Sequence, residues 1–306
     1  MRRPTWRRFP DSPMKLLDMI FHPGFFSSQP VHTALIVGGG AAIVSGIVGV
    51  FAVIRGQSFA GHSLADISSA GGSASFLLGV NPLLGFVVMA LFGGAGMEIF
   101  GVKQVRERDL VTGVVTGAGL GLSALLLYLT VSTTSIHGAA ITVMFGSMFA
   151  ISRAIMPLAL AIGVGSLLLV ALLYRPLLLT SLDSDLARVQ GLNIRLIEML
   201  FLMMLALAVS LSAITVGAIL STGLLIGPPA TALRLVNRPG QAMILAPVVG
   251  LAATWGGILL AYDSYGWTGG HSWPVSFCIV ALVFLFYVAS SLPWRTGDQP
   301  AAAVDS

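Results

Sequence analysis

A histidine and an aspartate lie four residues apart, at His62 and Asp66, in the small-residue segment GHSLADISSAGG. On a helix this spacing places both side chains on one face, one turn apart. An imidazole and a carboxylate in that geometry can share a proton or bind a divalent cation such as Zn²⁺. The pair could equally be a hydrogen-bonded lock between helices, and the spacing leaves both interpretations open.

A second polar segment, SLDSDLARVQGLNIRLIE, runs from Ser181 to Glu198. Asp183 or Ser184 can cap a short helix over 185–189, and Gly191 can end it. The pattern predicts a short amphipathic helix at the membrane surface, suited to docking on a soluble partner. An ordinary capped connector between two spans is the alternative.

Two acidic residues near predicted span ends are expected to be structural. Glu98 precedes the basic residues Lys103 and Arg106 and is expected to reach one of them at the interface. Glu198 follows Arg195 by one turn and has the same interpretation.

Four further residues carry weaker signals. His137 and His271 lie in predicted outer loops and are expected to be solvated. Asp263 stands where a span is expected to end, which favours helix capping over cation attraction. Cys278 is the single cysteine, so the chain has no internal disulfide and no cysteine-based zinc site, and we expect it to be a small core residue.

The elements that carry these residues follow from composition. The chain of 306 residues is 56% hydrophobic and 9% charged, against about 25% charged in soluble domains. This excludes a soluble enzyme, a disordered protein and a nucleic-acid binder. Continuous apolar runs of about 20 residues predict membrane helices rather than a β-barrel. The fold class is therefore all-α and polytopic. The spacing of Gly113, Gly117 and Gly121 predicts close helix packing.

The apolar runs predict eight or nine transmembrane helices. They lie near 31–54, 63–80, 82–101, 110–131, 155–178, 195–220, 221–236, 240–262 and 273–292. The run at 221–236 is short and is expected to be interrupted at Gly227-Pro228-Pro229, while 138–152 is too short to cross alone and is expected to be re-entrant or interfacial. Residues 1–30 form an N-terminal head, 31–292 the transmembrane domain and 293–306 a disordered cytoplasmic tail.

Basic residues occur in every second loop, whereas opposite loops such as TVSTTSIHG and YDSYGWTGGHSW lack lysine and arginine. The basic positions are Arg55; Lys103, Arg106 and Arg108; Arg175, Arg188 and Arg195; Arg234 and Arg238; and Arg295. By the positive-inside rule these loops are cytoplasmic, the C-terminus is inside and, with nine spans, the N-terminus is outside. The arginines at 2–8 run against this orientation.

Three segments of the chain resemble the permease subunits of bacterial ABC importers for zinc, manganese and iron. They are RGQSFAGHSLADISSAGGSASFLLGVNP at 55–82, LLLTSLDSDLARVQGLNIRLIE at 177–198 and AITVGAILSTGLLIGPPATALRL at 213–235. The resemblance implies a fold like the membrane domain of the vitamin B12 importer and a location in the bacterial inner membrane. It also implies a homodimer with the cation path at its interface, two cytoplasmic ATPase subunits and an extracytoplasmic metal-binding protein.

The resemblance also assigns residues. It makes the polar segment a coupling helix that contacts the ATPase through Asp183, Asp185, Ala187, Arg188, Gly191, Leu192 and Asn193. It places His62 and Asp66 in the translocation path, although many relatives have the acid first and the histidine four residues later. Two copies would offer two His and two Asp, a set that fits Zn²⁺, Mn²⁺ or Fe²⁺, and zinc is favoured.

No phosphate-binding motif of the form G-x-x-x-x-G-K-[ST] occurs in the sequence. The chain is therefore not expected to bind ATP through a P-loop, and the resemblance implies that ATP hydrolysis resides on a separate ATPase chain. We expect no tightly bound cofactor and no nucleic-acid partner. Two other functions remain open from the residues. A proton-coupled secondary metal transporter would use the same His/Asp pair without an ATPase, and a non-transporting scaffold would use it as a packing lock.

Overall fold

The computed structural model describes residues 25, 28–100, 105–133, 138–267 and 272–292. All regular structure in these ranges is helical, which confirms the all-α fold class. Seven helices there are long and apolar enough to cross a membrane. With α3 (Ser58–Leu78) and the shorter apolar helix α12 (Val275–Ser291), nine long helices are described, which is roughly consistent with the eight or nine predicted spans.

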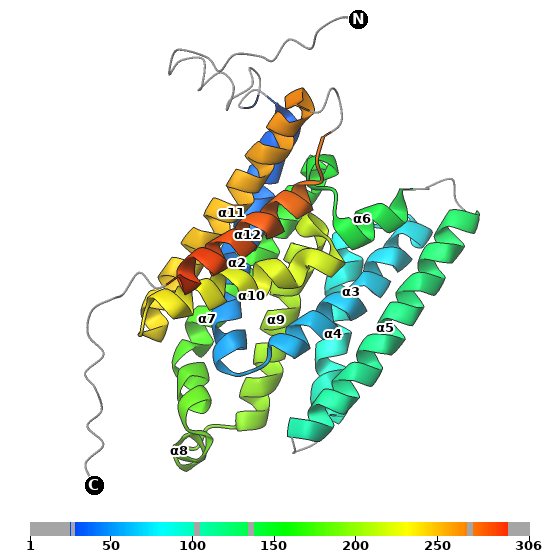
Figure 1. Cartoon of the computed structure of the whole chain (residues 1–306). Helices are drawn as coiled ribbons and strands as arrows, with labels where there is room; N and C mark the ends of the chain where they lie inside the picture. Colours follow the sequence, from blue (N-terminus) through cyan, green and yellow to red (C-terminus); the bar gives the residue numbers. More distant parts are fainter. Residues whose placement is uncertain (1–24, 26–27, 101–104, 134–137, 268–271, 293–306) are drawn as a thin grey trace, which may run out of the picture.

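The other helices follow the predicted runs closely, within a few residues at most ends. They are α2 (Gln29–Ile54), α4 (Pro82–Phe100), α5 (Val105–Thr133), α7 (Met156–Leu182), α9 (Ile194–Val216), α10 (Ala218–Leu235) and α11 (Pro239–Trp267). The N-terminal head (apart from Phe25 and residues 28–30) and the tail at 293–306 lie outside the described residues. In Figure 1, α8 (Ser184–Val189) lies at the lower end of the molecule and α6 (Ala139–Phe145) at the upper end.

The segment at 138–152 does not cross the bundle. It forms the seven-residue helix α6 and the 3₁₀ turn Met148–Ala150. The prediction that this run is too short to span the membrane is therefore confirmed.

The predicted boundary between the spans at 195–220 and 221–236 is wrong by a few residues. The chain breaks at Gly217, where φ is +92°. A side chain at Gly217 would collide with the backbone of Met144 and Phe145 at the end of α6. Only glycine tolerates both this φ and this approach, so a crossing of two backbones sets the break.

The predicted interruption at Gly227-Pro228-Pro229 is also wrong, because α10 continues through both prolines. Proline has no N–H, so Pro229 leaves the carbonyl of Leu225 without its usual helical donor. This carbonyl faces Gly49 of α2 so closely that a side chain at Gly49 would collide with it. The helix survives because a neighbouring helix packs against the altered turn.

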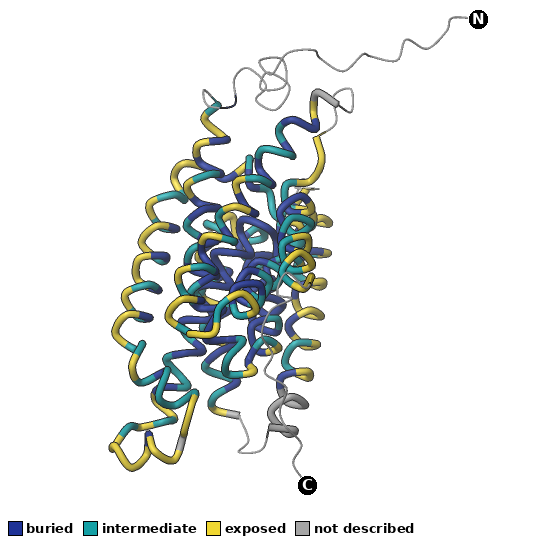
Figure 2. Tube along the Cα trace, turned by 60° about the vertical axis from the view of Figure 1, so that its left-hand side comes forward, coloured by how far each residue is buried: buried dark blue, intermediate teal, exposed yellow. Residues whose placement is uncertain are grey.

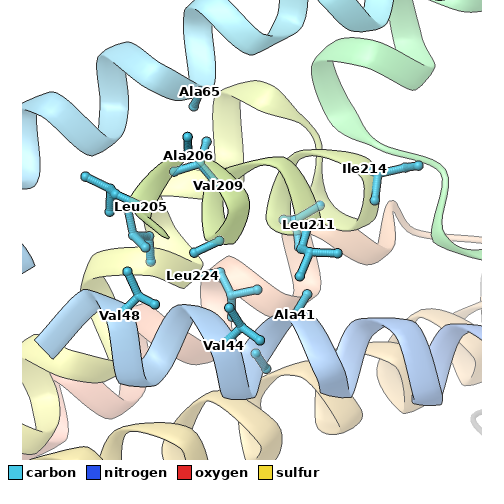
Figure 3. Packing of buried hydrophobic residues seen from close by; sticks show 14 of the residues in the cluster. Ala41, Val44, Val48, Ala65, Leu205, Ala206, Val209, Leu211, Ile214 and Leu224 are labelled. Carbon is cyan, nitrogen blue, oxygen red and sulfur yellow. The ribbon is translucent and has the colours of Figure 1, made fainter. Parts of the chain in front are cut away.

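The centre of the molecule lies where α2 and α9 meet. Most of each helix is buried, whereas the outer helices α5 and α7 are largely exposed. Figure 2 shows the buried residues gathered in the middle of the molecule. Side chains of the two central helices face one another, together with Leu224 of α10 and Ala65 of α3 (Figure 3). The labelled residues on α2 and α9 include Val44, Val48, Leu205, Val209 and Leu211.

The buried residues of helix α3 are mainly small, and Leu64 and Ile67 are its buried large apolar side chains. The helix packs against α4 and α5, and a side chain at Gly71 would collide with the carbonyl of Gly85 on α4. The predicted close contact at Gly113, Gly117 and Gly121 of α5 is not found within the chain, since an added Cβ would meet nothing within 4 Å at any of them. The other face of α5 approaches α3 instead.

Candidate functional site

His62 and Asp66 lie on one face of α3, as the spacing predicted. The Nε2 atom of His62 is 3.5 Å from Oδ2 of Asp66. The aspartate side chain is 7% exposed, while the histidine side chain is 44% exposed in the single chain. The carboxylate of Asp66 is therefore buried, and the imidazole of His62 lies between it and the protein surface.

A residue from another helix orients the imidazole. The Nδ1 atom of His62 lies 2.9 Å from Oγ1 of Thr222 on α10. When Nδ1 carries the proton it donates to this hydroxyl, and the lone pair of Nε2 then points toward Asp66 and any cation there. Sequence reasoning missed Thr222. The sequence shows Thr222 only as a hydroxyl-bearing residue in an apolar span. Its contact with His62 becomes visible only in the three-dimensional structure.

The hydroxyl groups around the pair are occupied by their own helix. Ser63 donates to the carbonyl of Phe59 at 3.0 Å, and Ser69 donates to the carbonyl of Asp66 at 2.6 Å. These bonds satisfy buried serines locally. They leave the carboxylate of Asp66 facing His62 rather than neighbouring serines.

The pair does not make a complete metal site within one chain. Among the described residues, no group of three or more His, Cys, Asp and Glu side chains is close enough to hold a metal ion. Transition metals in proteins usually take four or more ligands. Within the described part of the chain, His62 and Asp66 therefore supply only about half of a ligand set.

The predicted surface helix is present as α8. Asp183, rather than Ser184, is its cap, since its carboxylate accepts the N–H groups of Asp185 at 2.9 Å and Leu186 at 3.0 Å. Gly191 ends the turn with φ of +77°.

The segment that leads from α8 into α9 is equally well defined. Leu192 donates its N–H to the carbonyl of Ala187 at 3.1 Å. Asn193 caps α9 by accepting the N–H of Leu196 at 3.2 Å. Ala187 is buried, so it fixes the inner side of α8 against the bundle.

The outer side of α8 is exposed and mixed in character. The side chains of Arg188 and Asp185 are 71% and 89% exposed and lie 3.9 Å apart, an arrangement that contributes little stability. Leu186 and Val189 are also exposed, at 46% and 84%. Apolar and charged groups together at the lower end of the bundle form a surface suited to a protein partner (Figure 1).

The two acidic residues near span ends form ion pairs. Glu98 lies 3.8 Å from Nε of Arg195, and Glu198 lies 3.7 Å from Nη2 of Arg55. The structural role predicted for both is in keeping with these pairs. The side chains of Lys103 and Arg106, named as partners of Glu98, lie outside the described residues.

The remaining predictions have mixed outcomes. His137 and His271 lie outside the described residues. Asp263 is 3% exposed and lies inside α11, which continues to Trp267, so the interpretation of Asp263 as an end-of-helix cap is wrong. Cys278 is 2% exposed, which confirms a small core residue.

These features define a multi-pass helical membrane protein with a His–Asp pair in its bundle, of which the aspartate is buried, and a short exposed helix at one end. The sequence profile of the ABC 3 transport family matches residues 27–292. The chain belongs to this family. The resemblance seen in the sequence and the predicted multi-pass protein of the bacterial cytoplasmic membrane are thereby confirmed.

Curated relatives extend over most of the chain. The manganese transport system membrane protein MntC of Listeria monocytogenes is 29% identical over 88% of this chain and 94% of its own length. The high-affinity zinc uptake system membrane protein ZnuB of Haemophilus influenzae is 27% identical over 76% of this chain and 88% of its own length. Both relatives are named as membrane proteins of metal transport or uptake systems.

Solved structures share the fold. PsaBC from Streptococcus pneumoniae, solved in complex with Fab, superposes with a TM-score of 0.76 at 26% identity, over 90% of this chain and 95% of that chain. A metal-chelate type ABC transporter in an inward-facing conformation gives a TM-score of 0.67 at 17% identity, over 95% of this chain and 92% of that chain. This second likeness concerns the fold alone, and together they confirm the predicted importer permease fold.

Proposed function

We propose that this chain is the permease subunit of an ATP-driven importer for a divalent transition metal, which passes between helices at His62 and Asp66. The observation that carries the proposal is the His62–Asp66 contact of 3.5 Å on a helix otherwise lined with small residues. Ionisable side chains within a membrane span are costly and are retained mainly for function.

The metal is the finer part of the proposal. Carboxylate oxygen suits Mn²⁺, and imidazole suits Zn²⁺ and Fe²⁺ as well. The relatives do not favour the preference for zinc drawn from the ligand set, since several of them are named for manganese and fewer for zinc or iron. Manganese is therefore the first metal to test, with zinc second.

The partners follow from what one chain lacks. Half a ligand set supports a second copy whose His62 and Asp66 complete the site. The lack of a P-loop motif in the sequence and the exposed α8 support a pair of separate ATPase subunits docked there. An extracytoplasmic metal-binding protein would deliver the ion at the end that carries α6.

The chemistry of such a site is transient binding. A permeation site must attract the ion yet release it. Asp66 supplies negative charge, and the Nε2 lone pair of His62 supplies one ligand, oriented by Thr222. Movement of α8 under ATP-driven closure of the ATPases would rock the two copies and change access to the pair.

The test is metal uptake by proteoliposomes that hold the permease, its ATPase and its metal-binding protein. Replacing Asp66→Asn or His62→Gln should lower ATP-dependent uptake of radioactive manganese or zinc by at least about ten-fold, because each removes one ligand type. His32→Gln, at an exposed position in the first turns of α2, is the matched control and should keep wild-type uptake. Unchanged uptake in both site variants, or uptake without ATP, would overturn the proposal.

A further inference from the structure

Arg55 differs from the other arginines at the α8 end of the molecule. Its side chain is 6% exposed, whereas those of Arg188 and Arg195 are 71% and 75% exposed. An exposed arginine would serve the positive-inside rule as well as a buried one. Burial of a guanidinium is costly unless it is paired and hydrogen-bonded, so the position of Arg55 requires another explanation.

The guanidinium of Arg55 contacts two different helices at once. Its Nη1 atom donates to Oγ1 of Thr180 at 2.9 Å and to Oγ of Ser181 at 3.2 Å, both in the last turn of α7. Its Nη2 atom is 3.7 Å from Glu198, and its Cζ atom is 5.1 Å from the ring centroid of Phe201, both on α9. A planar fork with several fixed donors can make these contacts together, whereas an ammonium group cannot.

The two helices that Arg55 joins are the stems of α8. Helix α7 ends at Leu182, immediately before the docking helix, and α9 begins at Ile194, just after it. Arg55 therefore lies at the base of the α7–α8–α9 hairpin and holds its two stems together. A force applied to α8 reaches these stems first.

Arg55 is also covalently close to the candidate metal pair. It ends α2, and α3 begins three residues later at Ser58. The turn between them is tight, with φ of +65° at Gly56 and a hydrogen bond of 2.8 Å from the N–H of Gln57 to the carbonyl of Ala52. His62 follows one turn into α3.

We propose that Arg55 is a positioning residue that links the docking helix to the metal-bearing helix. Displacement of the α7–α8–α9 hairpin moves Thr180, Ser181 and Glu198, and the guanidinium transmits this movement to the α2–α3 turn and so to His62 and Asp66. This inference rests on the proposed function. Rigid packed elements with charged cross-links are the physical means by which two sites can be coupled.

The test separates coupling from stability by measuring metal transported per ATP hydrolysed in the reconstituted complex. Arg55→Met keeps the length and apolar stem but removes every donor. We expect the variant to bind the ATPase and hydrolyse ATP within about two-fold of wild type, while the transport ratio falls at least about ten-fold. Arg55→Lys should restore the ratio only in part.

Arg234→Met is the matched control. Arg234 lies at the inner end of α10 and contacts Tyr287 through a hydrogen bond of 2.7 Å and a ring contact of 4.3 Å. Like Arg55, it makes a hydrogen bond and a cation–π contact, but it is exposed, and its contacts join α10 to α12 and not the stems of α8. Its transport ratio should remain that of wild type.

Two outcomes would overturn the inference. One is a wild-type ratio in Arg55→Met. The other is an equal loss of assembly, ATP hydrolysis and transport, which would give Arg55 a purely structural role. If Arg55→Met does not fold, its partners are changed instead. Glu198→Gln and the double variant Thr180→Val/Ser181→Ala must then lower the ratio of metal transported to ATP hydrolysed. Failure of the proposed function is distinguishable, because the wild-type complex itself would then show no ATP-dependent metal transport.

Discussion

The two helices that carry the predicted functional residues are held in place by opposite means. Helix α3 depends on its neighbours: glycines against α4, a hydroxyl of α10 on His62 and burial of Asp66. Helix α8 depends mainly on residues of its own loop, namely the Asp183 cap, the left-handed Gly191 and the buried Ala187. Changes far away in sequence should therefore damage the site on α3, whereas α8 should respond mainly to changes within its own loop.

The largest expected effect on stability comes from a change at the contact between α3 and α4. Gly71→Ala places a Cβ against the carbonyl of Gly85 and the side chain of Met89. Because backbone cannot yield as a flexible side chain can, we expect a loss of about 2–3 kcal/mol in stability and of metal uptake as well. Thermal unfolding of the purified chain measures the first, and proteoliposome uptake the second.

Gly113→Ala on α5 is the control for this change, since its Cβ would meet nothing within 4 Å. Alanine is the better helix former by about 1 kcal/mol, so this variant should be neutral or more stable. Equal stability of the two variants would contradict the close packing of α3.

A smaller effect is expected when the imidazole loses its partner. Thr222→Val keeps the shape of the side chain but removes the hydroxyl that lies 2.9 Å from His62. Outer-shell partners of metal ligands usually contribute about ten-fold or more, so we expect the apparent KM for metal to rise about ten-fold with little change in stability. Thr222→Ser should restore uptake, and a failure of this rescue would show that the methyl group matters instead.

The smallest expected effect on stability and ATPase binding comes from removing the Asp183 cap of α8. Asp183→Ala removes the acceptor for two N–H groups and should cost about 1 kcal/mol locally. Copurification of the ATPase should weaken about five-fold, while thermal unfolding of the bundle stays unchanged. Asp183→Ser keeps a cap and should recover binding, and a fall in global stability with Asp183→Ala would break the contrast between the two helices.

Much of the fold could be predicted from sequence because its signals are local. Apolar runs marked the spans, and the capping aspartate and Gly191 marked α8. The signals failed where a neighbouring helix decides the outcome. Helix α9 ends at Gly217 rather than at residue 220 because the end of α6 packs against the backbone there. Helix α10 continues through Pro229 because Gly49 leaves room for the carbonyl of Leu225 in the altered turn.

The candidate site shows the same division. The spacing of His62 and Asp66 placed them on one helix face, since that geometry is internal to α3. Thr222 and the burial of Arg55 could not be predicted, because each depends on contacts between residues more than a hundred positions apart. A basic residue after a span reads as a topology signal whether it is exposed or buried.

In the proposed dimer, metal passes between two His62–Asp66 pairs, one from each chain. Equilibrium binding of Mn²⁺ to the purified permease–ATPase complex, with bound metal counted per permease chain, is the decisive measurement. We expect one ion for every two chains at saturation, and loss of this ion in Asp66→Asn. One ion per chain, or binding that is unchanged in Asp66→Asn, would rule the shared site out.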